Sequence, residues 1–184
     1  MASELRVDKI IPTTGVPTGG GGSIVQVVQN VVTSSSTGTA GTPASVMTCS
    51  ITPRALTNKI LIMIDANVGS SNGYGTLASL YRGTGGSGVQ LYFGDEDNNR
   101  PRVTRVVTAY PNAATTYNAI PMQINYLDSP STTSEVTYDL RLDSYQTQGW
   151  SFNRSWANQL DTSYSPPEYD GKAASSMILM EVSA

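Results

Sequence analysis

Two short acidic segments are the first places in this sequence where side chains could do chemistry. They contain these carboxylates: Asp95, Glu96 and Asp97 in the first, and Glu168 and Asp170 in the second. Paired carboxylates hydrolyse glycosides when they face each other across a cleft at a defined separation. Adjacent acidic residues in polar segments are more often solvated loops, so the sequence favours a non-enzymatic protein over one that cleaves glycans.

The chain contains no histidine and a single cysteine, Cys49. Without histidine, Ser-His-Asp and Cys-His catalysis and histidine-based metal sites are excluded. Cys49 lies among apolar neighbours in the strand-like segment 46–52, which predicts a small core residue rather than a nucleophile. One cysteine also cannot form an intrachain disulfide.

The first acidic segment begins like a calcium-binding loop, because Asp95, Asp97 and Asn99 follow a D-x-D-x-N pattern. The sixth position, where an EF-hand needs glycine, is Arg100, and the twelfth, where it needs glutamate, is Val106. An EF-hand is therefore excluded. We expect a loop whose carboxylates pair with nearby arginines and no cofactor, with a looser calcium site as the alternative.

Aromatic side chains are concentrated between residues 145 and 169, among amides and charged groups. Such a surface suits stacking on sugar rings and docking of proteins. We expect Phe152 to be a core residue. For Trp150, burial in the core is the alternative to surface binding. For Trp156, Tyr164 and Tyr169, surface binding and interface burial are equally open. The candidate receptor or partner surface consists of Trp150, Trp156, Tyr164, Tyr169, Asp95 and Asp97.

The elements that carry these side chains are short β-strands. Period-two alternation of apolar and polar residues is clearest in segments 120–126 and 136–142, and it predicts two half-buried strands. The turn-forming segment 127–134 between them predicts a β-hairpin with one apolar and one wet face. The segment 59–68 is apolar on both sides through Ile64, which predicts a central strand or one buried in a subunit interface.

Composition and turn spacing predict one all-β domain. The chain has 184 residues, of which 14% are charged, and it lacks helix-like periodic runs. Turn signals about every ten residues predict a sandwich or jelly roll. Residues 1–22 end in a Pro/Gly-rich linker. We therefore expect an antiparallel β-sandwich or jelly roll over residues 23–184, with an extended N-terminal docking arm over residues 1–22.

The distribution of charge argues against two classes of partner. The formal net charge is −3, with both signs interspersed, so no concentrated basic face for nucleic acid is expected. Three arginines at positions 100, 102 and 105 are instead expected to form inter-subunit ion pairs with Asp65, Asp139 or Asp143. No apolar run reaches membrane-spanning length, and the start, MASELRVDKI, lacks a secretory signal, which predicts synthesis in the cytoplasm without membrane insertion.

Four segments together carry a family resemblance: ELRVDKIIPTTG, TPRALTNKILIMI, INYLDSPSTTSEVTYDLRL and GKAASSMILMEVSA. They resemble virion structural proteins of tailed bacteriophages that infect marine bacteria and cyanobacteria, especially tail-fibre-like proteins. The resemblance covers most of the chain and lies in whole segments rather than in a catalytic signature. It implies a β-sandwich tip that assembles as a homotrimer, with an N-terminal arm that attaches it to the particle.

The resemblance also implies a place and a role. The expected location is the virion, in the tail rather than on the capsid, and the role is attachment to a host glycan or protein. Specificity would lie in loops 92–101 and 146–169, and the distal surface is expected in loops 92–101 and 150–169. The alternatives are a capsid-decorating or head-fibre protein and a glycan-binding or glycan-cleaving tailspike-like module. The arm residues that would dock into a neighbouring virion protein are Leu5, Val7, Ile10, Ile11 and Pro12.

Overall fold

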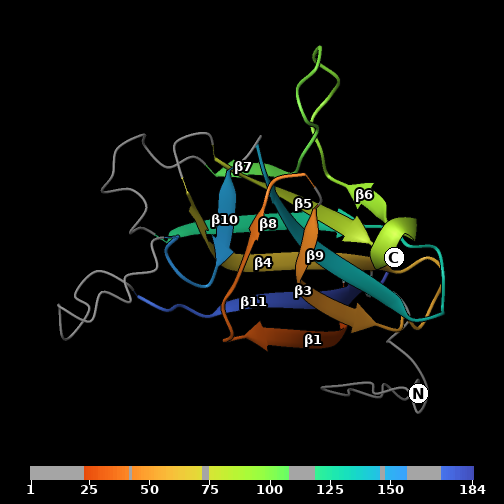
Figure 1. Cartoon of the computed structure of the whole chain (residues 1–184). Helices are drawn as coiled ribbons and strands as arrows, with labels where there is room; N and C mark the ends of the chain where they lie inside the picture. Colours follow the sequence, from red (N-terminus) through yellow and green to blue (C-terminus); the bar gives the residue numbers. More distant parts are fainter. Residues whose placement is uncertain (1–22, 42, 72–74, 108–118, 146–147, 157–170) are drawn as a thin grey trace, which may run out of the picture.

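Strands account for almost all regular structure in the computed structural model of the chain (Figure 1). The structure describes residues 23–41, 43–71, 75–107, 119–145, 148–156 and 171–184. One short 3-10 turn, η1 (Gly85–Ser87), interrupts the β-structure. The strands are β1 (Ile24–Val32), β2 (Ser36–Thr39), β3 (Ala44–Ile51), β4 (Lys59–Ser70), β5 (Thr76–Arg82), β6 (Val89–Leu91), β7 (Arg105–Val107), β8 (Ile120–Asp128), β9 (Val136–Ser144), β10 (Gly149–Phe152) and β11 (Ser175–Val182).

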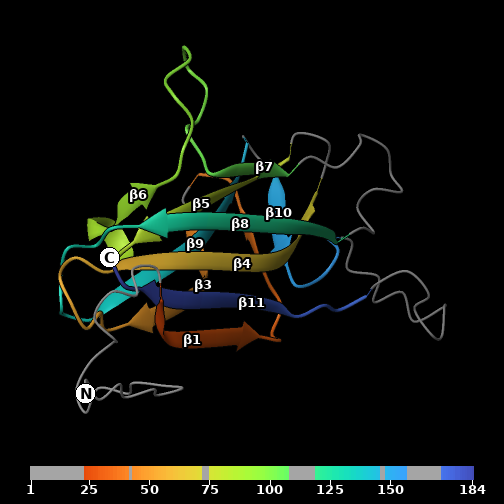
Figure 2. The same ribbon diagram turned by 180° about the vertical axis from the view of Figure 1, so that it is seen from behind.

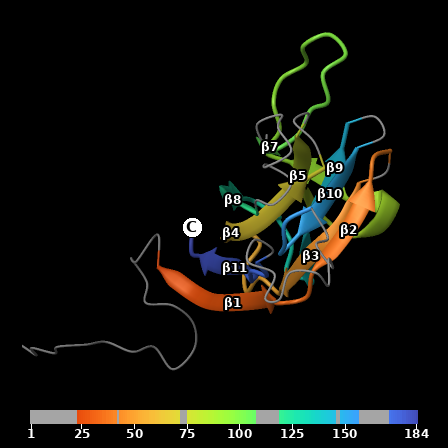
Figure 3. The ribbon, with the colours of Figure 1, turned by 60° about the vertical axis from the view of Figure 1, so that its left-hand side comes forward.

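These strands form two antiparallel sheets that pack face to face, as the end view in Figure 3 shows. Sheet A contains the order β1-β11-β4, with β8 on the other edge of β4. Strand β10 continues along the edge of β4 beyond the start of β11, and β2 pairs with β10. Sheet B has the order β3-β9-β5, and the free edge of β5 pairs with β6 and β7. The chain is therefore an antiparallel β-sandwich, which confirms the predicted fold class.

The core between the sheets follows from strict alternation along the strands. On β4, Ile60, Ile62 and Ile64 point inward and are fully or almost fully buried. Leu140 and Leu142 of β9 meet them from sheet B. Each such aliphatic side chain contributes about 1.5–3 kcal/mol when it leaves water. Cys49 on β3 is buried in the same core, as predicted, and burial raises the pKa of its thiol.

The predicted hairpin between segments 120–126 and 136–142 is wrong, although both predicted strands exist. Strand β8 pairs with β4 in sheet A, whereas β9 pairs with β3 and β5 in sheet B. The connection through residues 129–135 thus crosses from one sheet to the other. The apolar faces of both strands turn toward each other across the core, so each strand buries its face without pairing with the other.

A polar bridge crosses the sandwich near this connection. Asp128 on β8 is buried and accepts hydrogen bonds from the Tyr138 hydroxyl on β9 at 2.7 Å and from Arg82 Nη1 on β5 at 2.9 Å. Burial raises the pKa of Tyr138 far above its ordinary value, and the hydrogen bond to Asp128 raises it further. The Tyr138 hydroxyl therefore stays a donor. The bridge joins sheet A to sheet B and fixes how β8 lies over β9.

Several other strand predictions are confirmed. The segment 46–52 lies in β3 with Met47 and Ile51 buried, and the segment 59–68 is the central strand β4. The segment 24–32 is the edge strand β1. The predicted arm, residues 1–22, lies outside the described residues. Within the described chain, no helix has the length and apolar character needed to cross a membrane.

Candidate functional site

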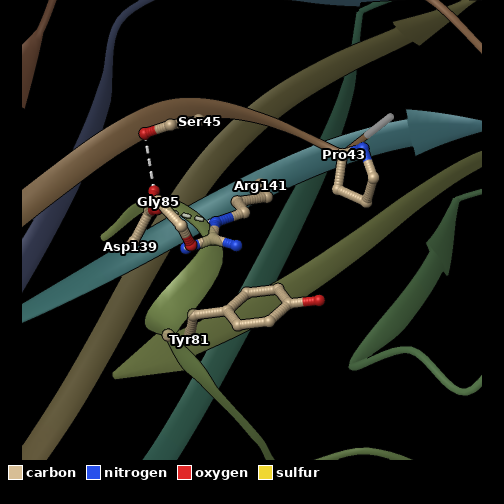
Figure 4. Close-up of a pocket in the computed structure, with 7 residues that line it drawn as sticks. Pro43, Ser45, Tyr81, Gly85, Asp139 and Arg141 are labelled. Carbon is tan, nitrogen blue, oxygen red and sulfur yellow. Dashed lines mark hydrogen bonds and ion pairs between the residues drawn. The ribbon is translucent and has the colours of Figure 1, made fainter. Parts of the chain in front are cut away.

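A cavity of about 490 Å³ opens on the outer face of sheet B (Figure 4). Alternation along β9 places Asp139 and Arg141 on this outer face, and strand register places Tyr81 of β5 opposite Asp139. Ser45 comes from β3, on the other side of β9, where it is opposite Arg141. The lining consists of Pro43, Ser45, Tyr81, Gly85, Gly88, Asp139 and Arg141.

Asp139 and Arg141 form a fully partnered ion pair at the bottom of this cavity. Arg141 Nε donates to Asp139 Oδ2 at 2.7 Å, and Ser45 Oγ donates to Asp139 Oδ1 at 2.6 Å. The Arg141 guanidinium also lies 3.9 Å from the centroid of the Tyr81 ring. Because the Asp139 side chain is almost completely shielded from water, these partners are what make a buried carboxylate tolerable here.

Arg141 also holds the glycine-rich turn that forms the rim of the cavity. Its Nη2 donates to the carbonyl of Gly85 at 2.9 Å and to that of Gly83 at 3.3 Å. Both glycines have positive φ, 95° at Gly83 and 64° at Gly85, a backbone conformation that other residues adopt only with strain. Strands β5 and β6 pair on either side of this turn, so it is the loop of a β-hairpin.

The side chains that line the cavity do not form a catalytic or metal-binding arrangement. It contains a single carboxylate, Asp139, which is already engaged, so the cavity does not offer the facing pair that glycoside hydrolysis needs. The Tyr81 hydroxyl points away from Asp139 (Figure 4). Among the described residues, no group of acidic or cysteine side chains is arranged to hold a metal ion.

Replacing Tyr81 by leucine is expected to lower the free energy of unfolding by about 0.5–2 kcal/mol, because the cation–π contact with Arg141 is lost. Urea unfolding measures the change. The matched variant Tyr81→Phe keeps the ring and loses only the hydroxyl, so its unfolding midpoint should stay near that of the unmodified chain. Equal losses in both variants would contradict a role for the ring face.

A second surface is the base of the loop 92–104, which projects from the sandwich between β6 and β7 (Figure 1). Tyr92 and Phe93 are both exposed there. The Tyr92 ring stacks on Tyr126 with centroids 5.3 Å apart, and Arg105 lies 5.1 Å above the Tyr92 centroid. Arg102 lies 4.5 Å above the centroid of Phe93. The 92–101 loop thus projects from the sandwich and carries an aromatic–arginine cluster at its base, and its role in specificity stays a prediction.

The arginines near this loop have partners within the same chain, of which one is expected and the others are not. Arg100 Nε pairs with Asp97 Oδ2 at 3.0 Å, which confirms a salt-bridged acidic loop. Asp139, however, is taken by Arg141 of the same chain. Arg105 donates to the carbonyls of Gln123 and Thr104. The expected pairing of Arg100, Arg102 or Arg105 with Asp139 is therefore wrong, because the alternation of β9 places Arg141 two residues from Asp139 on the same face.

The six predicted surface residues have different fates. The prediction that Trp150 is a contact residue is wrong, because its side chain is 2% exposed and belongs to the core. Trp156 is half-buried, and its ring lies against Gly149. Asp95 and Asp97 are exposed in the projecting loop, as predicted. Tyr164 and Tyr169, like the arm residues 5–12, lie outside the described residues.

Sequence reasoning did not single out Tyr81, Tyr92 or Arg141 as site residues. Alternation along segment 136–142 predicts that Asp139 and Arg141 share the outer face of the strand, which the structure confirms, although Asp139 is buried there rather than solvent-exposed. The missing information was the register between β9 and β5, which alone brings Tyr81 beside this pair.

Comparison with known proteins gives only a distant structural likeness. No family model matches the sequence, and no curated protein matches it. Among solved structures, the chain is similar to infectious bursal disease virus, Gt strain, with 13% identity, a TM-score of 0.40 and coverage of 95% of this chain and 43% of that chain. The VP2 subviral particle of the same virus gives 14% identity, a TM-score of 0.37 and coverage of 95% and 43%. The chain thus spans less than half the length of these viral chains.

Proposed function

We propose that this chain is a structural protein of a bacteriophage particle, a tail-fibre tip that assembles as a homotrimer and contributes to attachment to the host surface. The resemblance of four sequence segments to tail-fibre-like proteins supports the phage assignment. In this proposal the arm residues Leu5, Val7, Ile10, Ile11 and Pro12 dock into a neighbouring virion protein.

The bonding of the buried carboxylates is the observation that supports a structural rather than a catalytic role. Asp128, Asp139 and Glu181 are the buried acidic residues among those the structure describes. Asp128 bridges the two sheets, Asp139 pairs with Arg141, and Glu181 accepts hydrogen bonds from the turn before β4. Each carboxylate is thus committed to holding the fold, whereas a catalytic acid or base must reach a substrate.

The aromatic–arginine cluster at the base of loop 92–104 is the proposed contact with the host surface. Exposed aromatic rings and arginines are enriched where proteins bind partners, and aromatic faces also stack on sugars. Here Tyr92 and Phe93 are held in place by Arg105 and Arg102, so the cluster is ordered before any contact forms. A pre-ordered surface loses less conformational entropy on binding.

Immunogold labelling of intact phage particles tests the location. Antibodies raised against the purified protein should label the distal end of the tail if the chain is a fibre tip. Labelling over the head would replace the tail assignment with the capsid-decorating alternative. Particles that carry no label would contradict a structural role in the virion altogether.

Replacing Tyr92 and Phe93 together by alanine is expected to weaken binding of the purified protein to host cells on the order of tenfold, as for interface aromatics elsewhere. Competition against phage adsorption measures the effect. The control is Leu56→Ala, an exposed apolar residue in the turn between β3 and β4, which should compete as well as the unmodified protein. Undiminished competition by the double variant would place host contact elsewhere.

A further inference from the structure

The outer face of sheet A carries an apolar row that crosses four neighbouring strands. Strand register aligns four outward residues, one from each strand: Val27 on β1, Met180 on β11, Leu61 on β4 and Leu127 on β8. The next row adds Ile178 and Met63 side by side on β11 and β4. All of these side chains point away from the core, since the residues between them on each strand are the buried ones.

Two strands of sheet B have the opposite character on their outer face. Their outward positions are polar: Thr137, Asp139, Arg141 and Asp143 on β9, beside Thr48 and Ser50 on β3, whereas Leu77 and Val106 add apolar positions on β5 and β7. The Ser50 and Thr137 hydroxyls are hydrogen-bonded at 2.7 Å across β3 and β9. An antiparallel sheet that faces water normally alternates apolar inward with polar outward, so the apolar row of sheet A departs from the pattern that β9 and β3 follow.

No described residue covers this apolar face (Figure 2). Val27 is 55% exposed and Leu127 is 47% exposed, and Met63 between them is also exposed. Four strands at a spacing of about 4.8 Å, paired over about nine residues of about 3.4 Å each, give a face of roughly 600 Å² in projection. This area is that of the whole face, in which polar positions such as Gln29 and Asn125 lie beside the apolar row, and it is somewhat smaller than the roughly 800 Å² per partner of a stable protein interface. An exposed apolar row within such a face is the kind of feature that marks an interaction site.

The charge pattern fits a second copy of this chain as the occupant. Lys59 and Asp65 carry the only charges among the outward residues of the four paired strands in the described chain, and on β4 they flank the two apolar positions Leu61 and Met63. Copies that turn this face toward a common rotation axis can therefore meet at their apolar centres without like charges opposing each other there. Closed rotational symmetry of this kind is what most soluble homo-oligomers have.

We propose that the outer face of sheet A, centred on Val27, Leu61, Met63, Leu127 and Met180, is the surface through which copies of this chain associate. The inference rests on the proposed homo-oligomer and names the face that builds it. The outer face of sheet B, with its cavity, and the projecting loop 92–104 then remain available for contacts outside the oligomer.

The test compares the solution mass of the full-length protein with two matched double variants. Val27→Lys/Leu127→Lys places charges on the proposed face. Val89→Lys/Leu56→Lys places the same charges at equally exposed apolar sites outside it, 56% at Val89 and 61% at Leu56. The face variant should raise the dissociation constant of assembly on the order of 100-fold and give single chains at concentrations where the unmodified protein is assembled. The control variant should keep the unmodified mass.

Two results would overturn the proposal. If the face variant keeps the mass of the unmodified oligomer, another surface makes the oligomer. If the unmodified protein is a single chain in solution, copies do not associate through this face. Residues outside the described chain are then the alternative that covers the apolar face. Neither result bears on the place of the protein in the particle, which immunogold labelling reports separately. Far-UV circular dichroism checks folding, and the milder variant Val27→Thr/Leu127→Gln gives the same readout if the lysine variant unfolds.

Discussion

Replacing Trp150 by alanine is expected to lower the free energy of unfolding by about 3–5 kcal/mol, because it empties a large volume in the core. Trp150 on β10 is buried where β10 and β2 meet the end of β4, and its ring lies directly against Gly38. A side chain at Gly38 would overlap the ring, since its Cβ would lie 2.3 Å from Trp150 Cζ2. For a chain of this size the loss corresponds to a fall in melting temperature of roughly 6–20 °C.

The same variant decides between the two roles that the sequence allows for Trp150. Thermal and urea unfolding measure stability, and the control Leu56→Ala, at an exposed position, should unfold with the unmodified chain. If Trp150→Ala left stability unchanged and instead abolished adsorption to host cells, the tryptophan would be a contact residue and the described core would be wrong at this point.

Strand existence could be predicted here because apolar alternation reports which side of a strand is buried. That is why the predicted strands 46–52, 120–126 and 136–142 agree with β3, β8 and β9, and why the outer side of β9 is predicted correctly even though Asp139 on that side is buried. Alternation does not report which strand lies alongside. The alternation over 120–142 fits both a hairpin and a connection that crosses between the sheets. In the structure β8 pairs with β4, so the connection crosses between the sheets.

The candidate site was less predictable because it depends on register between distant segments. Asp139 and Arg141 share a face through local alternation alone, but Tyr81 joins them only through the pairing of β5 with β9. The loop base shows the same dependence, since Tyr126 reaches Tyr92 from the other sheet. The segment 59–68 is apolar on both sides, and it is the one place where the sequence itself indicates contacts with distant parts of the structure. Its outward residues Leu61 and Met63 break the polar alternation that a solvated face would show.

Replacing Glu181 by glutamine is expected to lower the free energy of unfolding by about 2–4 kcal/mol at neutral pH. The buried Glu181 carboxylate faces donors only: the Arg54 amide and the Asn58 side-chain amide, each at 2.6 Å, and the Gln26 side-chain amide at 2.5 Å. A glutamine amide would turn an N–H group toward one of these donors and leave both without an acceptor. Urea unfolding measures the loss. Glu135→Gln removes the same charge from an exposed position and should have little effect.

The pH dependence of this loss identifies its cause. Burial raises the pKa of Glu181, but hydrogen bonds from Asn58, Arg54, Gln26 and Ala55 outweigh burial and hold the pKa below its ordinary value of 4.5. Because the pKa is lower in the folded than in the unfolded state, the stabilisation is fully present above about pH 4.5 and is lost as the pH falls through the lowered folded value. The stability difference between the unmodified chain and Glu181→Gln should therefore be constant from about pH 7 to about pH 5 and shrink at more acidic pH. A difference that stayed the same at acidic pH would mean that charge on Glu181 does not stabilise the fold, and the loss would then come from packing alone.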